Sequence, residues 1–381
     1  MRVACLVAGL LLLGSGPCSA VGQTLVGGMA PVVLHRVAKG DGKHREFTSV
    51  TLLPGRGLNL FQVTARLPGR GETELLRSPS VDEAARVLNG QGEDAFGNLN
   101  HSFGGAFLIP FTSRLGGELS SDKKTVQVAW RDKHWNVPND YLGHYAVHGL
   151  VNMMKAEDIR IRKTPDGETL TAVIHAGDFG GYWLSKTDLH YTVALTADAV
   201  DVSIRAVNVG GEDEPMGMGW HPYLKIISGN RAQARVHIPA EEYTVVDTVD
   251  GRPTGELKPV DGTPKDYRSA QGALLPDAST SVNFSKLTRS GDTHRGSLDA
   301  WLADPAANYA IRVRGLSPEM RTVHLWSAKG DVFCALEEQY NFMDALGPEW
   351  KGMDTGMVAL KPGSATTWHV KLEMFDPPSA P

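Results

Sequence analysis

The stretch LHYTVALTADAVDVSIRA, residues 189–206, decides the fold class of this chain. Apolar side chains occupy every second position from Leu189 to Leu195 and again from Val202 to Ala206. Such alternation is typical of a strand with one buried face. The Ala197-Asp198 break between the two runs is short enough for a tight turn. The stretch therefore predicts two antiparallel strands joined by a hairpin.

Strand patterns of the same kind recur on both sides of this hairpin. Residues 48–53 and 58–67 are each followed by the turn sequence Pro-Gly-Arg-Gly, and alternation returns in residues 368–374. Only residues 81–88 have a helical pattern, with Ser80 at the N-cap position. The sequence therefore predicts an all-β fold, a large antiparallel β-sandwich.

Length and composition fit a globular protein. The length of 381 residues leaves one large domain and two smaller ones open. The sequence has no internal repeat and no low-complexity linker, which favours a single domain over residues 21–381. A net charge of -5 gives no general attraction to nucleic acid. The sequence leaves the oligomeric state open.

The first twenty residues have the pattern of a secretory signal peptide. Arg2 precedes the apolar run of residues 3–13, and small residues follow up to Ala20. That run is shorter than the roughly 20 residues of a membrane span, so an uncleaved anchor is the weaker interpretation. A lipoprotein signal at Cys18 is weaker still, because Pro17 precedes it. We expect an exported chain, periplasmic or secreted, that has no membrane segment once residues 1–20 are removed.

Two side chains are candidates for acid–base chemistry. His221 lies between Trp220 and Pro222; it is either a packed core histidine or a general acid, since imidazole titrates near neutrality. Glu337 follows the apolar residues 333–336, and burying a carboxylate there is costly without a partner. Alternation turns one of Glu337 and Glu338 inward and the other to solvent, but spacing does not say which.

Other polar residues leave two interpretations each. His144 and His148 have the i, i+4 spacing of metal ligands on a helix, but no further ligand completes a site, so we expect no metal. Arg114 forms either a surface ion pair or a hydrogen-bonding fork for a polar ligand. Asp299 is either a turn residue or a carboxylate that binds hydroxyl groups.

Taken in order, the motifs of residues 50–375 resemble the aldose 1-epimerase (galactose mutarotase) family. The matching stretches are Thr51 to Gly57, Ser113-Arg114, His148-Gly149, Asn208, Gly219-Trp220-His221-Pro222-Tyr223-Leu224, Pro253 to Leu257, Gly262-Thr263-Pro264, Asp266, Asp299, Leu336-Glu337-Glu338-Gln339 and Leu360-Lys361-Pro362-Gly363.

The resemblance implies a galactose mutarotase-like supersandwich, an enzyme without cofactor and a free aldose such as glucose or galactose as substrate. It assigns the catalytic base to Glu337 and the catalytic acid to His221. It also implies that Arg114, His148 and Asp299 bind the sugar. The alternatives are a non-catalytic sugar-binding protein of the same fold and an epimerase of a sugar phosphate, for which Arg114 alone is thin support.

Four features depart from the family pattern. Ser113 replaces the usual Asn, Leu150 replaces a second Gly, and Glu338 replaces the usual Pro. The stretch of residues 82–105 is longer than usual. All four surround the expected pocket, so the identity of the sugar is left open.

Overall fold

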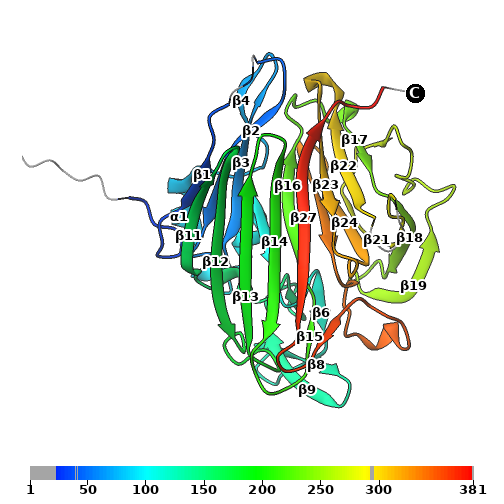
Figure 1. The fold of residues 1–381 in the computed structure, drawn as a ribbon. Helices are drawn as coiled ribbons and strands as arrows, with labels where there is room; N and C mark the ends of the chain where they lie inside the picture. The colour runs from blue at the N-terminus through cyan, green and yellow to red at the C-terminus, as the bar shows by residue number, and fades with distance from the viewer. Residues whose placement is uncertain (1–22, 39, 41, 292–295, 380–381) are drawn as a thin grey trace, which may run out of the picture.

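Two large antiparallel sheets pack face to face in the computed structural model, which describes residues 23–38, 40, 42–291 and 296–379 (Figure 1). In that part of the chain the larger sheet has nine strands, in the spatial order β11 (Glu157–Thr164), β12 (Gly167–Gly177), β13 (Thr187–Leu195), β14 (Ala199–Asn208), β27 (Ala365–Phe375), β23 (Tyr309–Gly315), β22 (Leu298–Asp304), β17 (Arg235–His237) and β20 (Ala273–Leu274).

The second sheet holds most residues of the candidate active site. Among the described residues its seven strands follow the order β19 (Pro253–Pro259), β18 (Ala240–Val246), β21 (Thr280–Leu287), β24 (Thr322–Ser327), β25 (Phe333–Gln339), β16 (Gly219–Lys225) and β5 (Gly105–Leu108). An N-terminal sheet consists of β1 (Val32–His35), β2 (Glu46–Leu53), β3 (Asn59–Leu67) and β4 (Gly71–Glu74).

Small elements complete the fold. The short strands are β6 (Arg114–Gly116) paired with β10 (Tyr145–Val147), β15 (Glu214–Met216) paired with β26 (Val358–Leu360), and the meander β7 (Glu118–Leu119), β8 (Thr125–Trp130) and β9 (Lys133–Pro138). The helical segments are α1 (Val81–Val87) and the 3₁₀ turns η1 (Gly92–Asp94), η2 (Asn98–Ser102), η3 (Val151–Met153), η4 (Arg231–Gln233), η5 (Pro305–Ala307) and η6 (Pro348–Trp350).

The structure confirms the predicted β-sandwich. The 189–206 stretch forms the antiparallel pair β13 and β14, with Leu189 opposite Ala206. The other predicted strands appear as β2, β3 and β27; β2 and β27 extend beyond the predicted residues, whereas β3 begins one residue later than predicted. The predicted helix is α1, and the Ser80 side chain accepts a hydrogen bond from the Glu83 N–H at 3.2 Å, which caps its N-terminus.

Aromatic side chains join the two sheets. Phe107 of β5 contacts Tyr191 of β13 at 5.5 Å between ring centroids and Trp368 of β27 at 6.1 Å. All three are almost fully buried in one continuous apolar core. Because the seven-stranded sheet is packed on this side, its other face remains for polar groups.

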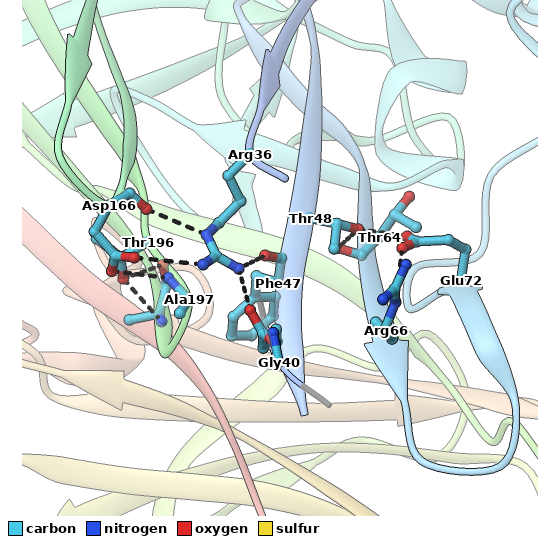
Figure 2. A network of polar contacts seen from close by, with 12 residues as sticks. Arg36, Gly40, Phe47, Thr48, Thr64, Arg66, Glu72, Asp166, Thr196 and Ala197 are labelled. Atoms are coloured by element: carbon cyan, nitrogen blue, oxygen red, sulfur yellow. Dashed lines mark hydrogen bonds and ion pairs between the residues drawn. The ribbon is translucent and has the colours of Figure 1, made fainter. Parts of the chain in front are cut away.

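An arginine connects the N-terminal sheet to the turns of the larger sheet (Figure 2). Arg36 pairs with Glu46 at 2.7 Å and donates to the carbonyl oxygens of Phe47 and Asp166. Asp166 lies between β11 and β12, and its carboxylate accepts from the N–H of Ala197 in the β13–β14 turn. This network fixes one edge of the sandwich at a distance from the site described below.

The predicted signal peptide, residues 1–20, lies outside the described residues. No helix within the described ranges is long and apolar enough to cross a membrane. The single domain over residues 21–381 stays a prediction.

Candidate active site

Strand order brings the main polar groups into one row. β25 lies between β16 and β24. Glu337 pairs with His324 on one side, and the register of Gly219 with Gln339 and Tyr223 with Ala335 puts His221 opposite Glu337 on the other. Neighbours on the same face of adjacent strands lie within contact distance. Three residues far apart in sequence thus form one titratable row.

His221 and Glu337 are in direct contact. His221 Nε2 lies 3.3 Å from Glu337 Oε1, and their side chains are 6% and 0% exposed. The Gln339 side-chain amide donates to Glu337 Oε2 at 2.7 Å and so fixes the carboxyl group. Glu337 Oε1 forms no aligned hydrogen bond with any described residue. One carboxyl oxygen is therefore held by Gln339, and the other lies beside the imidazole without an aligned hydrogen bond.

Glu338 corrects one expectation. Glu337 and Glu338 are both buried, at 0% and 1% exposed, so the prediction that one of them faces solvent is wrong. β25 is buried on both of its faces from Cys334 to Gln339. Glu338 points away from the site toward Gly315 at the end of β23, where any Cβ atom would clash with its carboxyl oxygen.

His148 reaches the site through two residues with left-handed backbone. His148 has φ 57° and Gly149 φ 80°. A Cβ atom at Gly149 would overlap the Ile109 carbonyl oxygen, so glycine is required there. The strained turn brings the His148 ring to 5.1 Å from His221, almost perpendicular to it. Non-glycine residues held at positive φ are enriched at functional sites.

Arg114 lies at the start of β6, opposite Val147 in the register with β10. Its guanidinium lies over the rings of Tyr145 and Tyr141, at 5.1 and 5.7 Å. The charge of Arg114 helps to lower the pKa of His148, so the guanidinium lies close to that histidine. No carboxylate of the described residues pairs with Arg114. Its donors are free for a polar ligand.

Two histidines of the site were missed in the sequence. His324 stands on β24 beside Glu337. His101 lies in η2, with its ring 4.7 Å from His148 and 6.3 Å from His221. The position of His324 inside the apolar run Val323 to Trp326 could have marked it as a buried polar residue. No comparable sequence signal marks His101, because its position depends on how residues 82–105 fold back.

Aromatic rings extend the row of polar groups. Tyr223, two residues after His221 on β16, has its ring 4.8 Å from that imidazole. The rings of Trp326 and Phe333 contact Tyr223 at 5.6 and 5.2 Å. The site therefore combines hydrogen-bonding groups with an apolar wall, as pockets for small polar molecules do.

Burial controls the charges here. It lowers the pKa of His221 to about 4. Burial, with the nearby His221, lowers the pKa of His101 and of His324 to about 3, and burial takes that of His148 well below its usual range. Burial raises the pKa of Glu337 well above its usual range, partly offset by the Gln339 hydrogen bond. Near neutral pH the imidazoles are therefore neutral, and the carboxyl group of Glu337 keeps its proton to higher pH than an exposed glutamate does.

Unpaired polar atoms concentrate at this place. The Nδ1 atoms of His101, His148, His221 and His324, together with Glu337 Oε1 and Gln339 Oε1, are buried without hydrogen-bond partners in the described structure. Leaving a buried polar group unpaired costs about 1–3 kcal/mol. A cluster of such atoms is expected where a polar ligand supplies the missing partners.

Asp299 lies apart from this cluster. It belongs to β22 of the nine-stranded sheet and pairs with Arg314 at 3.0 Å. It lines a separate cavity of about 460 Å³ with Trp301 and His237, whose rings stack. Its charge acts on Glu338, which points to the opposite side of β25 from Glu337. The structure therefore brings His221, Glu337, Arg114 and His148 together and leaves Asp299 outside.

The i, i+4 spacing of His144 and His148 does not form a helical face. β10 lies between His144 and His148, so the two are not on a helix. Within the described ranges, no group of three histidine, cysteine, aspartate or glutamate side chains is arranged to hold a metal ion.

The sequence model of the aldose 1-epimerase family matches residues 76–373, most of the chain and every member of the cluster. The chain belongs to the aldose 1-epimerase family. Part of it is also similar to YphB of Escherichia coli K12, an uncharacterized protein. The two chains are 28% identical over an aligned stretch of 134 residues, and this stretch covers 34% of this chain and 39% of YphB.

Solved structures support the fold assignment. A galactose mutarotase-like protein of Clostridium acetobutylicum superposes with a TM-score of 0.70 at 18% identity, over 91% of this chain and 98% of that one. A galactose 1-epimerase of Lactobacillus acidophilus NCFM superposes with a TM-score of 0.63 at 15% identity, over 91% and 98%. At these identities the likeness shows a shared sandwich fold, which confirms the predicted galactose mutarotase-like architecture.

Proposed function

We propose that this aldose 1-epimerase family member is a mutarotase, which interconverts the α and β anomers of a free aldose such as glucose or galactose. The observation that carries the proposal is the His221–Glu337 contact of 3.3 Å inside a cluster of unpaired polar atoms. Mutarotation needs one base and one acid that reach the same sugar, and it needs no cofactor.

The proposed reaction opens and recloses the sugar ring. Glu337 takes the proton of the C1 hydroxyl group while the bond between C1 and the ring oxygen breaks. The electron pair of that bond goes to the ring oxygen, which receives a proton from His221. The open-chain aldehyde rotates about its C1–C2 bond and recloses on the other face of C1, with both proton transfers reversed.

One proton of the pair can lie on Glu337 or on His221. Before a sugar enters, burial favours that proton on Glu337, because both groups are then neutral. Transfer across the 3.3 Å contact gives carboxylate and imidazolium, the arrangement that the proposed roles require. Hydroxyl groups of the sugar would stabilise the charged form by hydrogen bonds to both groups.

Arg114 and His148 are the proposed sugar-binding residues. His148 Nδ1 is buried without a partner and its ring lies 5.1 Å from that of His221, while the Arg114 guanidinium acts on His148; hydroxyl groups both donate and accept. The role of Asp299 inferred from the family motif stays a prediction, although its ion pair with Arg314 on the other sheet gives it no position near His221.

Export completes the proposal. The signal-like pattern of residues 1–20 supports a periplasmic or secreted location, where free sugars are available. The alternative of a sugar-binding protein without turnover is less favoured, because binding alone has no need of an acid and a base in contact.

Polarimetry tests the proposal. Freshly dissolved α-glucose or α-galactose should reach its equilibrium rotation faster with the protein present than without it. His221→Ala and Glu337→Gln should each lower the rate by about 10²–10⁴, the usual contribution of acid–base catalysis. Glu337→Gln copies the protonated carboxyl group in shape, so its fold should be kept.

Glu338→Gln is the matched control. It changes a neighbouring buried carboxyl group that points to the other side of the sheet and should leave the rate unchanged. Full activity in either His221→Ala or Glu337→Gln would contradict the proposed mechanism. Tight sugar binding without any acceleration would favour the sugar-binding alternative.

A further inference from the structure

Residues 82–105 bring His101 to the other histidines and are held in place by buried polar contacts. Arg56 Nη2 pairs with Asp94 Oδ1 at 2.6 Å, and their side chains are 2% and 0% exposed. Asp94 also accepts from the N–H of Gly90 at 2.7 Å. A buried ion pair contributes little net stability because of its desolvation cost. Its effect here is to fix where this segment lies.

A second set of contacts holds the residue next to His101. Asn59 donates to both the backbone and side-chain oxygens of Asn100 at 3.0 Å. The Asn100 amide donates to the side chain of Asn152 at 3.0 Å, in the turn that follows His148. Asn59 and Asn100 are at most 1% exposed. The backbone at His101 is therefore placed from both the N-terminal sheet and the His148 loop.

We propose that His101 contacts the bound sugar directly and selects for a hydroxyl group at the ring position that it faces. The inference rests on the proposed mutarotase function. It assigns a purpose to the longer 82–105 stretch, because this stretch adds one imidazole to a cluster otherwise supplied by the strands and the His148 loop.

The surroundings of the His101 ring favour this role over plain packing. Its Nδ1 atom is buried and has no partner among the described residues. An apolar ring would fill the same space and make the same edge contact with His148 without that cost. With its pKa lowered to about 3 by burial, the imidazole is neutral and offers one donor and one acceptor. A hydroxyl group satisfies both kinds of atom.

Substrate comparison separates a sugar contact from a structural role. We would measure kcat/KM of wild type and His101→Ala on the best aldose and on its 2-deoxy, 6-deoxy and pentose analogues. His101→Ala should lower kcat/KM about tenfold on the parent sugar. It should have little effect on the one analogue that already lacks the contacted hydroxyl group. His101→Gln, which keeps a donor and an acceptor, should restore part of the loss.

His369→Ala is the matched histidine control. His369 lies on β27, where its ring pairs with Asp201 at 2.8 Å, and its loss should leave the substrate pattern unchanged. If His101→Ala lowers kcat/KM equally on every sugar, or if His101→Gln restores nothing, His101 is only structural. If the wild type accelerates no sugar at all, the proposed function fails instead, so the two failures are distinct. Should His101→Ala not fold, His101→Gln and His101→Asn would carry the same substrate comparison.

Discussion

Burial moves the pKa values of His221 and Glu337 in opposite directions, and this decides how many protons the pair holds. Desolvation lowers the first to about 4 and raises the second well above its usual range. The imidazole of His221 is therefore neutral above about pH 4, and the carboxyl group of Glu337 keeps its proton to higher pH than an ordinary glutamate. With ordinary pKa values of about 6.5 and 4.3, the one-proton state would be limited to the interval between them.

The pH profile of kcat/KM should reflect these shifts, because it reports the groups of the free enzyme. We expect a flat profile through pH 6.5 and a decline only near pH 4, where His221 becomes protonated and the pair loses its base. His101, His148, His324 and Tyr223 face the pair, with Arg114 near His148 and His324, and it is desolvation by this packing that opposes protonation of His221. Polarimetry across pH 4–8, after subtraction of the uncatalysed rate and with circular dichroism to verify folding, is the measurement. A break near pH 6.5 would contradict the assignment.

At the scale of single elements, the loop after β10 combines strain with function. His148 and Gly149 both have positive φ, and the glycine lies against the backbone of Ile109. Gly149→Ala should destabilise the protein by on the order of 2 kcal/mol or more and raise KM, because the clash displaces His148. Urea unfolding and polarimetry measure the two effects.

Gly143→Ala is the control for Gly149→Ala. Gly143 also has positive φ, at 74°, but no atom lies within 4 Å of the position that a Cβ would take. Gly143→Ala should cost only about 1 kcal/mol and leave KM unchanged. Equal effects of the two substitutions would show that the close approach to Ile109 has no consequence for the site.

The sequence predicted where single strands lie, but it did not predict which strands are buried on both faces. Alternation located β13, β14 and β27 because each has one apolar face toward the core. The same rule failed at Glu337 and Glu338, since β25 is covered on both sides and alternation then separates two buried environments. Only the family motif distinguished the two glutamates.

The site was predictable where a motif carried it and unpredictable where folding brings distant segments together. The motif residues His148, His221 and Glu337 do meet. His101 reaches them only through the fold of residues 82–105, which no local pattern encodes. Asp299 failed to join them because β22 belongs to the other sheet.

At the scale of the whole molecule, the neutral histidines make the folded state sensitive to acid. A histidine with a lowered pKa is neutral in both states above pH 6.5. Below that pH the unfolded chain binds a proton that the folded protein does not, so stability is lost as the pH falls toward the folded pKa. For His324, with a pKa of about 3, the loss spans about pH 6.5 to 3 at up to ~1.4 kcal/mol per pH unit. The buried carboxyl groups Glu337 and Glu338 act in the opposite direction, because their pKa values are raised.

Comparing variants isolates the histidine contribution, since the carboxyl groups are common to both proteins. His324→Gln should flatten the dependence of unfolding free energy on pH by up to about 1.4 kcal/mol per pH unit between pH 4 and 6. Urea unfolding at several pH values measures this slope. His134→Gln, at an exposed position on β9, should keep the wild-type slope because water surrounds that side chain. An unchanged slope in His324→Gln would mean that His324 takes up its proton in the folded protein. His324 would then carry a charge in the folded protein, which contradicts the neutral state that its burial predicts.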